Sequence, residues 1–132
     1  MSFLNKLFGT PSQENQESNI EPKFYTLTNI EELNAIDTAS FEKPIVLFKH
    51  STRCSISRFA LKRFDEAYSF TDSEMDWYLL DLLNYREVSN EIAVRYNVMH
   101  QSPQILVIRN GKTIYSASHD AIDATELKQF VL

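Results

Sequence analysis

The sequence predicts an α/β fold in which helices cover both faces of a mixed central sheet. Strand-like and helix-like segments alternate from residue 24 to the end of the 132-residue chain, in the order β-α-β-α-β-α-β-β-α. Two apolar runs, residues 44–48 and 77–80, are typical of strands buried on both faces of a sheet. Asn110-Gly111, between two extended segments, is the usual hairpin turn because both positions need positive φ.

The first half of the domain is predicted to contain two strands and two helices. Residues 24–27 can form a short strand, and a capping box then starts a helix, built either by Thr28 with Glu31 or by Asn29 with Glu32. After the buried strand at 44–48, a second helix is expected from Cys54 to Tyr68. Its apolar residues recur at helical spacing: Ile56, Phe59, Ala60, Phe64 and Ala67.

The second half is predicted to contain three strands and two helices. The strand at 77–80 precedes a helix opened by a capping box of Asn84 with Glu87, whose inward face carries Val88, Ile92 and Tyr96. The hairpin strands are residues 104–109 and 112–117. Asp123 then starts a final helix that extends to Val131, with Leu127, Phe130 and Val131 facing inward.

The N-terminal part of the chain differs in composition from the rest. Residues 11–23 contain almost no large apolar side chains, so they cannot offset the entropy of becoming ordered. We therefore divide the chain into a flexible segment, residues 1–22, and a domain, residues 23–132. Phe3, Leu4, Leu7 and Phe8 would share one face of a short helix, which either packs on the domain, stays disordered or anchors the chain to a partner or membrane surface.

Composition excludes several classes of protein. The chain has 13 Lys and Arg against 18 Asp and Glu, so it lacks the overall positive charge of nucleic-acid-binding proteins. No apolar run approaches the ~20 residues of a membrane helix, and the N-terminus has no secretory cleavage signature. We expect a cytoplasmic monomer that binds neither nucleic acid nor membrane.

The single cysteine, Cys54, is either an inert core residue or a reactive thiol, since one cysteine excludes an internal disulfide. Its position favours reactivity. Cys54 follows a buried strand at the first turn of a helix, and the helix N-terminus stabilises a thiolate over a thiol. Between residues 43 and 64 there are six basic residues and no acidic one: Lys43, Lys49, Arg53, Arg58, Lys62 and Arg63. Arg53 and Arg58 flank the cysteine and are the better candidates for function.

Cys54 and Ser57 form a C-x-x-S motif in which the serine replaces the resolving thiol of a dithiol oxidoreductase. The Ser57 hydroxyl could donate a hydrogen bond to the thiolate, or it could simply cap the helix or face solvent. Ser102-Pro103 precedes the hairpin strand, and His100 either modulates the thiol or is structural. The spacing of the histidines matches no metal-ligand pattern, so no metal is expected.

Three segments resemble the monothiol bacilliredoxins of the YtxJ type, which have a thioredoxin fold. They are FKHSTRCSIS (48–57), HQSPQILVIRNGK (100–112) and SASHDAI (116–122), and the resemblance covers residues 24–132. The family often has proline where this chain has Ser55. The resemblance implies that Cys54 removes bacillithiol, an anionic small thiol, from mixed disulfides on client proteins. Bacillithiol is then a co-substrate, and no tightly bound cofactor is expected.

The resemblance also suggests which residues support Cys54. It implies a cis peptide bond between Ser102 and Pro103, beside the cysteine. The supporting residues that we expect are Thr52, Arg53, Ser57, Arg58, His100, Ser102 and Pro103. Two alternatives remain open. One is an iron–sulfur cluster carrier of the monothiol glutaredoxin kind, which an absorption spectrum would identify, and the other is a binding module with an inert cysteine.

The division at residue 22 predicts that removing residues 1–22 leaves the domain folded. Because no strand or helix of the predicted sheet order begins before residue 24, the thermal midpoint should stay within about 2 °C of the parent, less than about 0.5 kcal/mol for a domain of this size. Thermal unfolding followed by circular dichroism measures this. A fall of several degrees would mean that Phe3, Leu4, Leu7 and Phe8 belong to the core.

Overall fold

The computed structural model describes residues 23–131, and its elements follow the predicted order. They are β2 (Tyr25–Thr26), α2 (Glu31–Ala39), β3 (Ile45–His50), α3 (Ser55–Ala67), β4 (Asp76–Asp81), α4 (Arg86–Arg95), β5 (Gln104–Arg109), β6 (Lys112–Ser118) and the 3₁₀ helices η1 (His119–Ala121) and η2 (Ala124–Phe130). The predictions made for residues 1–22 lie outside the described part of the chain.

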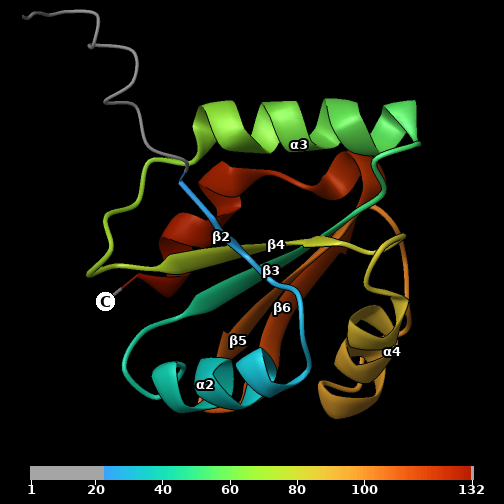
Figure 1. Cartoon of the computed structure of the whole chain (residues 1–132). Helices are drawn as coiled ribbons and strands as arrows, with labels where there is room; N and C mark the ends of the chain where they lie inside the picture. The colour runs from blue at the N-terminus through green and yellow to red at the C-terminus, as the bar shows by residue number, and fades with distance from the viewer. Residues whose placement is uncertain (1–22, 132) are drawn as a thin grey trace, which may run out of the picture.

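The five described strands form one mixed sheet in the order β2-β4-β3-β5-β6. β4 pairs in parallel with β2 and β3, whereas β5 pairs antiparallel with both β3 and β6. The β5–β6 turn is the predicted one, with φ of 55° at Asn110 and 74° at Gly111. In Figure 1, α3 and η2 lie on one face of the sheet, while α2 and α4 cover the other. The predicted α/β class is confirmed.

β3 lies at the centre of the sheet and separates two apolar cores. All six of its residues are buried, as the apolar run predicted. Ile45 and Leu47 pack in the core under α2 and α4, while Val46 and Phe48 pack in the core under α3 and η2. Successive side chains of β3 therefore point to opposite faces of the sheet. Lys49 and His50 continue the same alternation toward the carboxyl end of the strand, where α3 begins.

Two predicted helix starts have different outcomes. At α2 the capping box is Asn29 with Glu32: Asn29 Oδ1 accepts from the Glu32 N–H at 3.0 Å, and Glu32 Oε1 accepts from the N–H of Thr28 at 2.8 Å and that of Asn29 at 3.3 Å. The box predicted for α4 is wrong, because Asn84 instead donates to Asp81 Oδ2 at 2.7 Å and no side chain caps that helix. The Asn84 side chain thus bonds to Asp81, the last residue of β4, instead of capping α4.

The apolar stripe predicted on α3 is partly wrong. Ala60 and Phe64 are buried, but Ile56 and Phe59 are 62% and 64% exposed. Arg63 lies over the Phe59 ring, with its guanidinium carbon 5.7 Å from the ring centre. The buried residues of α3 are instead Ser57, Ala60 and Phe64, so near the start of the helix a polar side chain takes the inward position.

The last predicted helix also differs, since residues 124–130 form a 3₁₀ helix rather than an α-helix. Its start is as expected: Asp123 Oδ1 accepts from the Thr125 N–H at 3.0 Å. Leu127 is buried, whereas Phe130 and Val131 are only partly buried against the core. None of the helices in the described part of the chain is long and apolar enough to cross a membrane.

Candidate active site at the start of α3

Cys54 lies at the point where the central strand passes into α3. It is the N-cap residue of that helix, with extended backbone angles, rather than a residue of the first turn as predicted. Its N–H donates to the Ser51 carbonyl at 3.2 Å, and its carbonyl accepts from the Arg58 N–H at 3.0 Å. The thiol is half-buried, and no side-chain hydrogen bond caps α3. The sulfur is therefore held at the positive end of the helix dipole.

Ser57 is fully buried and is hydrogen-bonded to the end of β3. Its Oγ accepts from the Ser51 N–H at 3.0 Å and lies 2.7 Å from His50 Nδ1. If Ser57 donates its proton to Nδ1, the Ser57 hydroxyl is paired both as donor and as acceptor, and Nδ1 is paired as well. If Nδ1 donated instead, the serine proton would have no partner among residues 23–131, which is costly for a buried hydroxyl. We therefore assign the ring proton of His50 to Nε2.

The hydrogen bonds described for Ser57 go to the end of β3, which differs from the arrangements expected from the sequence. Within the described residues no hydrogen bond joins Ser57 to Cys54, and the side chain does not face solvent. Burial lowers the pKa of His50, which outweighs the opposing effect of the Asp81 carboxylate, and Arg58 lowers it further. His50 is thus a neutral ring at pH 7. His50 was not among the predicted site residues. Its position at the end of a buried strand, four residues before the cysteine, could have indicated it.

Arg58 reaches back over the turn that carries Cys54. One guanidinium nitrogen donates to the Thr52 carbonyl at 3.2 Å. The positive charge of Arg58 is therefore held against the backbone of the turn that precedes Cys54. Arg53, Thr52 and Arg58 are all exposed. The two arginines therefore flank the thiol as charged groups in contact with solvent.

Lys49 is not part of the surface patch around Cys54. It is fully buried, and its ammonium group makes one long bond, 3.4 Å, to the Ser89 carbonyl of α4. Since α4 and α3 cover opposite faces of the sheet, Lys49 lies across the sheet from the cysteine (Figure 1). Burial lowers its pKa from 10.5 to about 8.

His100 is close to Lys49 rather than hydrogen-bonded to Cys54. Burial lowers the pKa of His100, and the positive charges of Lys49 and Arg86 lower it further. No hydrogen bond between His100 and Cys54 exists in the described part of the chain. Its expected role as a modulator of the thiol is not supported by these contacts.

Ser102 and Pro103 lie at the sheet edge where β3 ends, because Gln104 pairs with Lys49 across the strands. The Ser102–Pro103 peptide bond is cis. The Pro103 carbonyl accepts from the His119 N–H at 3.0 Å, so it is already paired. The Ser102 backbone makes no hydrogen bond to any other residue between 23 and 131. The supporting residues thus divide into a group at the start of α3 and a group before β5.

A sequence profile described as "Monothiol bacilliredoxin BrxC" matches residues 25–127. The chain belongs to the monothiol bacilliredoxin family. Among solved structures, a protein described as a candidate oxidoreductase with a thioredoxin fold is 29% identical, with a TM-score of 0.69 over 81% of this chain and 92% of that one. The Fasciola hepatica thioredoxin is 17% identical, with a TM-score of 0.61 over 80% of this chain and 94% of that one.

Malassezia sympodialis thioredoxin is also similar, at 14% identity and a TM-score of 0.63 over 83% of this chain and 88% of that one. At these identities the two thioredoxins support the fold alone. The bacilliredoxin family and the similar oxidoreductase together support a thiol oxidoreductase-like role. The resemblance found from the sequence is confirmed, including its thioredoxin fold.

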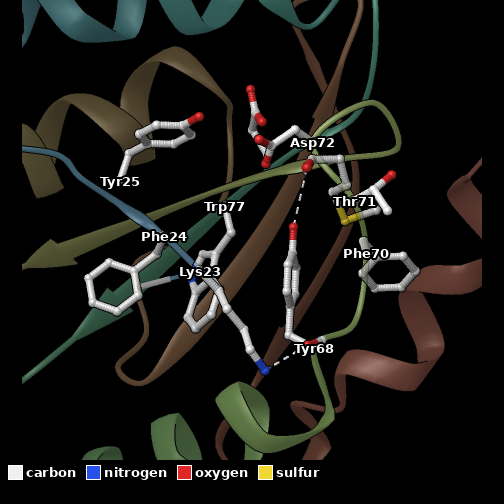
Figure 2. Close-up of a pocket in the computed structure, with 10 residues that line it drawn as sticks. Lys23, Phe24, Tyr25, Tyr68, Phe70, Thr71, Asp72 and Trp77 are labelled. Carbon is white, nitrogen blue, oxygen red and sulfur yellow. Dashed lines mark hydrogen bonds between the residues drawn. The ribbon is translucent and has the colours of Figure 1, made fainter. Parts of the chain in front are cut away.

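A hollow in the molecule lies away from Cys54. Figure 2 shows it around Trp77 and Tyr68, where Lys23 Nζ donates to the Tyr68 carbonyl at 2.9 Å. Tyr68 caps the end of α3 and Asp76 begins β4, so the hollow lies at the opposite sheet edge from Cys54. No three His, Cys, Asp or Glu side chains within residues 23–131 are grouped to hold a metal ion.

Buried Lys49 predicts a stability that rises with pH. Between pH 8 and 10.5 the unfolded chain holds the Lys49 proton more tightly than the folded one, so folding stability increases across this window. At pH 7, Lys49→Met should therefore be more stable than the parent, by up to about 3 kcal/mol. The difference should shrink from pH 8 to 10.5. Urea unfolding at several pH values tests this, with exposed Lys112→Met as the control that shows no such trend.

Proposed function

We propose that this chain removes bacillithiol from mixed disulfides on client proteins, using Cys54 as the nucleophile. The observation that carries the proposal is a half-buried cysteine at the N-cap of α3 in a chain with no second cysteine. Membership of the monothiol bacilliredoxin family supports it. A chain with one thiol can exchange a small thiol, but it cannot form the internal disulfide of a dithiol oxidoreductase.

In the first step, the Cys54 thiolate attacks the bacillithiol sulfur of the mixed disulfide. The sulfur–sulfur bond to the client breaks, a new one forms between Cys54 and bacillithiol, and the client leaves as a thiolate that takes up a proton from water. The number of disulfides is unchanged, so no electron donor is needed. In the second step an external thiol attacks the adduct, releases bacillithiol as a disulfide with that thiol and restores Cys54.

Three features of the site assist these steps. The N-terminal end of α3 favours the thiolate that attacks, because its dipole stabilises negative charge. Arg53 and Arg58 supply positive charge close to the sulfur for an anionic small thiol. The Ser102 backbone, which makes no hydrogen bond within residues 23–131, can hydrogen-bond with the extended client segment that carries the disulfide. His50 and Ser57 position the helix start through their hydrogen bonds to each other and to the Ser51 N–H.

The proposal extends to the setting in which the protein works. We propose a cytoplasmic monomer whose partners are bacillithiol-modified clients and free small thiols. The net charge of -5 favours solubility, and the sequence contains no apolar run long enough to span a membrane.

Transfer from a model client tests the function. A single-cysteine protein modified with bacillithiol is mixed with the parent or with Cys54→Ser, and intact mass spectrometry follows both chains. We expect the adduct to move from the client to the parent, while Cys54→Ser leaves the client modified at the uncatalysed rate because its nucleophile is gone. The same client modified with glutathione measures selectivity. Transfer by Cys54→Ser, or none by the parent, would contradict the proposal.

The position of Ser57 predicts the behaviour of Ser57→Cys. Residues 54 and 57 are the N-cap and the third residue of α3, one turn apart, so their sulfurs can bond. The bacillithiol adduct on Cys54 should then be released by the internal thiol, leaving a chain lighter by two hydrogens than the reduced form. Ser57→Ala, which has no thiol, should keep the adduct. A stable adduct on Ser57→Cys would show that the two side chains do not meet.

A further inference from the structure

A groove of about 400 Å³ runs beside α3, between the helix and the chain that enters β2. The residues that line it are Phe24, His50, Arg58, Leu61, Lys62 and Asp65. Four of them are on one face of the helix, because 58, 61, 62 and 65 follow the spacing of three, four and seven residues.

Cys54 does not line the groove, but Arg58, which does, is one helical turn away from it. Residues 54, 58 and 62 are four apart and lie in one row along the helix, so Arg58 is about 6 Å and Lys62 about 12 Å along the axis from the cysteine. The Arg58 guanidinium is held over the Cys54 turn by its bond to the Thr52 carbonyl. A small thiol bonded to Cys54 is long enough to reach this end of the groove.

The near end of the groove offers hydrogen-bond donors. Arg58 and Lys62 are exposed cations, and Ser57 occupies Nδ1 of His50, which leaves the Nε2–H of that ring available to a bound group. Asp65, seven residues beyond Arg58, is the acidic residue of the lining and lies at the far end. An anion is therefore favoured near Arg58 and disfavoured near Asp65, while Phe24 and Leu61 give the groove an apolar wall.

We propose that this groove binds the carboxylate end of the small thiol while its sulfur is bonded to Cys54, with Arg58 as the principal ligand and Lys62 and His50 beside it. The inference rests on the proposed function and deepens it, because it makes the groove the element that selects anionic small thiols. Selection acts on the small thiol and not on the client, since the groove lies along α3 rather than beside Ser102.

A charge series on one client tests the groove. The same single-cysteine protein is modified with 3-mercaptopropionate, 2-mercaptoethanol or cysteamine, which have similar lengths and carry a negative, no or a positive charge. Single-turnover transfer to Cys54 is followed by intact mass and divided by the rate with a free thiol as nucleophile. The quantity compared is the ratio of the anionic to the neutral adduct, because any effect on the Cys54 thiolate itself cancels in that ratio.

The parent should transfer the anionic adduct fastest and the cationic one slowest. Arg58→Gln should lower the anionic-to-neutral ratio about three- to tenfold, the range for one partly screened charge pair, and Lys62→Gln by less with so short a thiol. Lys112→Gln, which removes an exposed charge at the other end of the sheet, should leave the ratio unchanged. Thermal midpoints equal to the parent show that each variant is folded.

Two results would contradict carboxylate binding in the groove without contradicting the proposed function. One is transfer by the parent with no preference for charge. The other is an equal fall in the ratio for Arg53→Gln, which flanks Cys54 outside the groove, because that would show a general field around the thiol. Failure of the parent to transfer any of the three adducts would overturn the proposed function, and the groove with it.

Discussion

The whole site depends on how the buried central strand ends. β3 is buried at every position and pairs with a strand on each side, so its last residue, His50, cannot shift without disturbing the sheet. The Ser57 hydroxyl then joins His50 and the Ser51 N–H to the first turn of α3. A chain of hydrogen bonds and close packing thus fixes the helix start, and with it Cys54. Among residues 23–131, the serine of the C-x-x-S motif is thus hydrogen-bonded to the end of β3 and not to the cysteine.

The basic residues near the cysteine in the sequence lie on different faces of the sheet in the structure. Lys49 follows Leu47 on the face under α4, where burial lowers its pKa to about 8. Arg58 and Lys62 are on the exposed side of α3, beside the groove that leads away from Cys54. Charges that are neighbours in the sequence therefore act in two separate environments. Lys49 is in the buried environment, whereas Arg58 and Lys62 are exposed to solvent, where the proposed anionic small thiol would meet them.

The residues of α3 do not follow a simple apolar pattern, because its first turn contributes to the site and its later turns pack on the sheet. A helix that only packed on the sheet would bury its apolar residues, yet Ile56 and Phe59 are exposed while the polar Ser57 is buried. Near the start of the helix, the inward position is therefore taken by the hydrogen-bonded Ser57. Farther along, Ala60 and Phe64 pack in the apolar core. Such local departures from the apolar pattern are expected where function and stability compete.

The sequence alone determined the order of strands and helices along the chain, the buried central strand and the Asn110-Gly111 turn, because these follow from apolar runs and backbone preferences that act over a few residues. The strand predicted at 77–80 is less buried than expected, since Tyr78 and Leu79 of β4 are only partly buried. The sequence also placed Cys54 at a helix start, since strand, turn and helix are consecutive there. Only the tertiary structure decided the partners of Ser57, the face taken by Lys49 and the bond from Asn84 to Asp81. A hydroxyl, an amine or an amide can satisfy its hydrogen bonds in several ways, and burial against residues far along the chain selects among them.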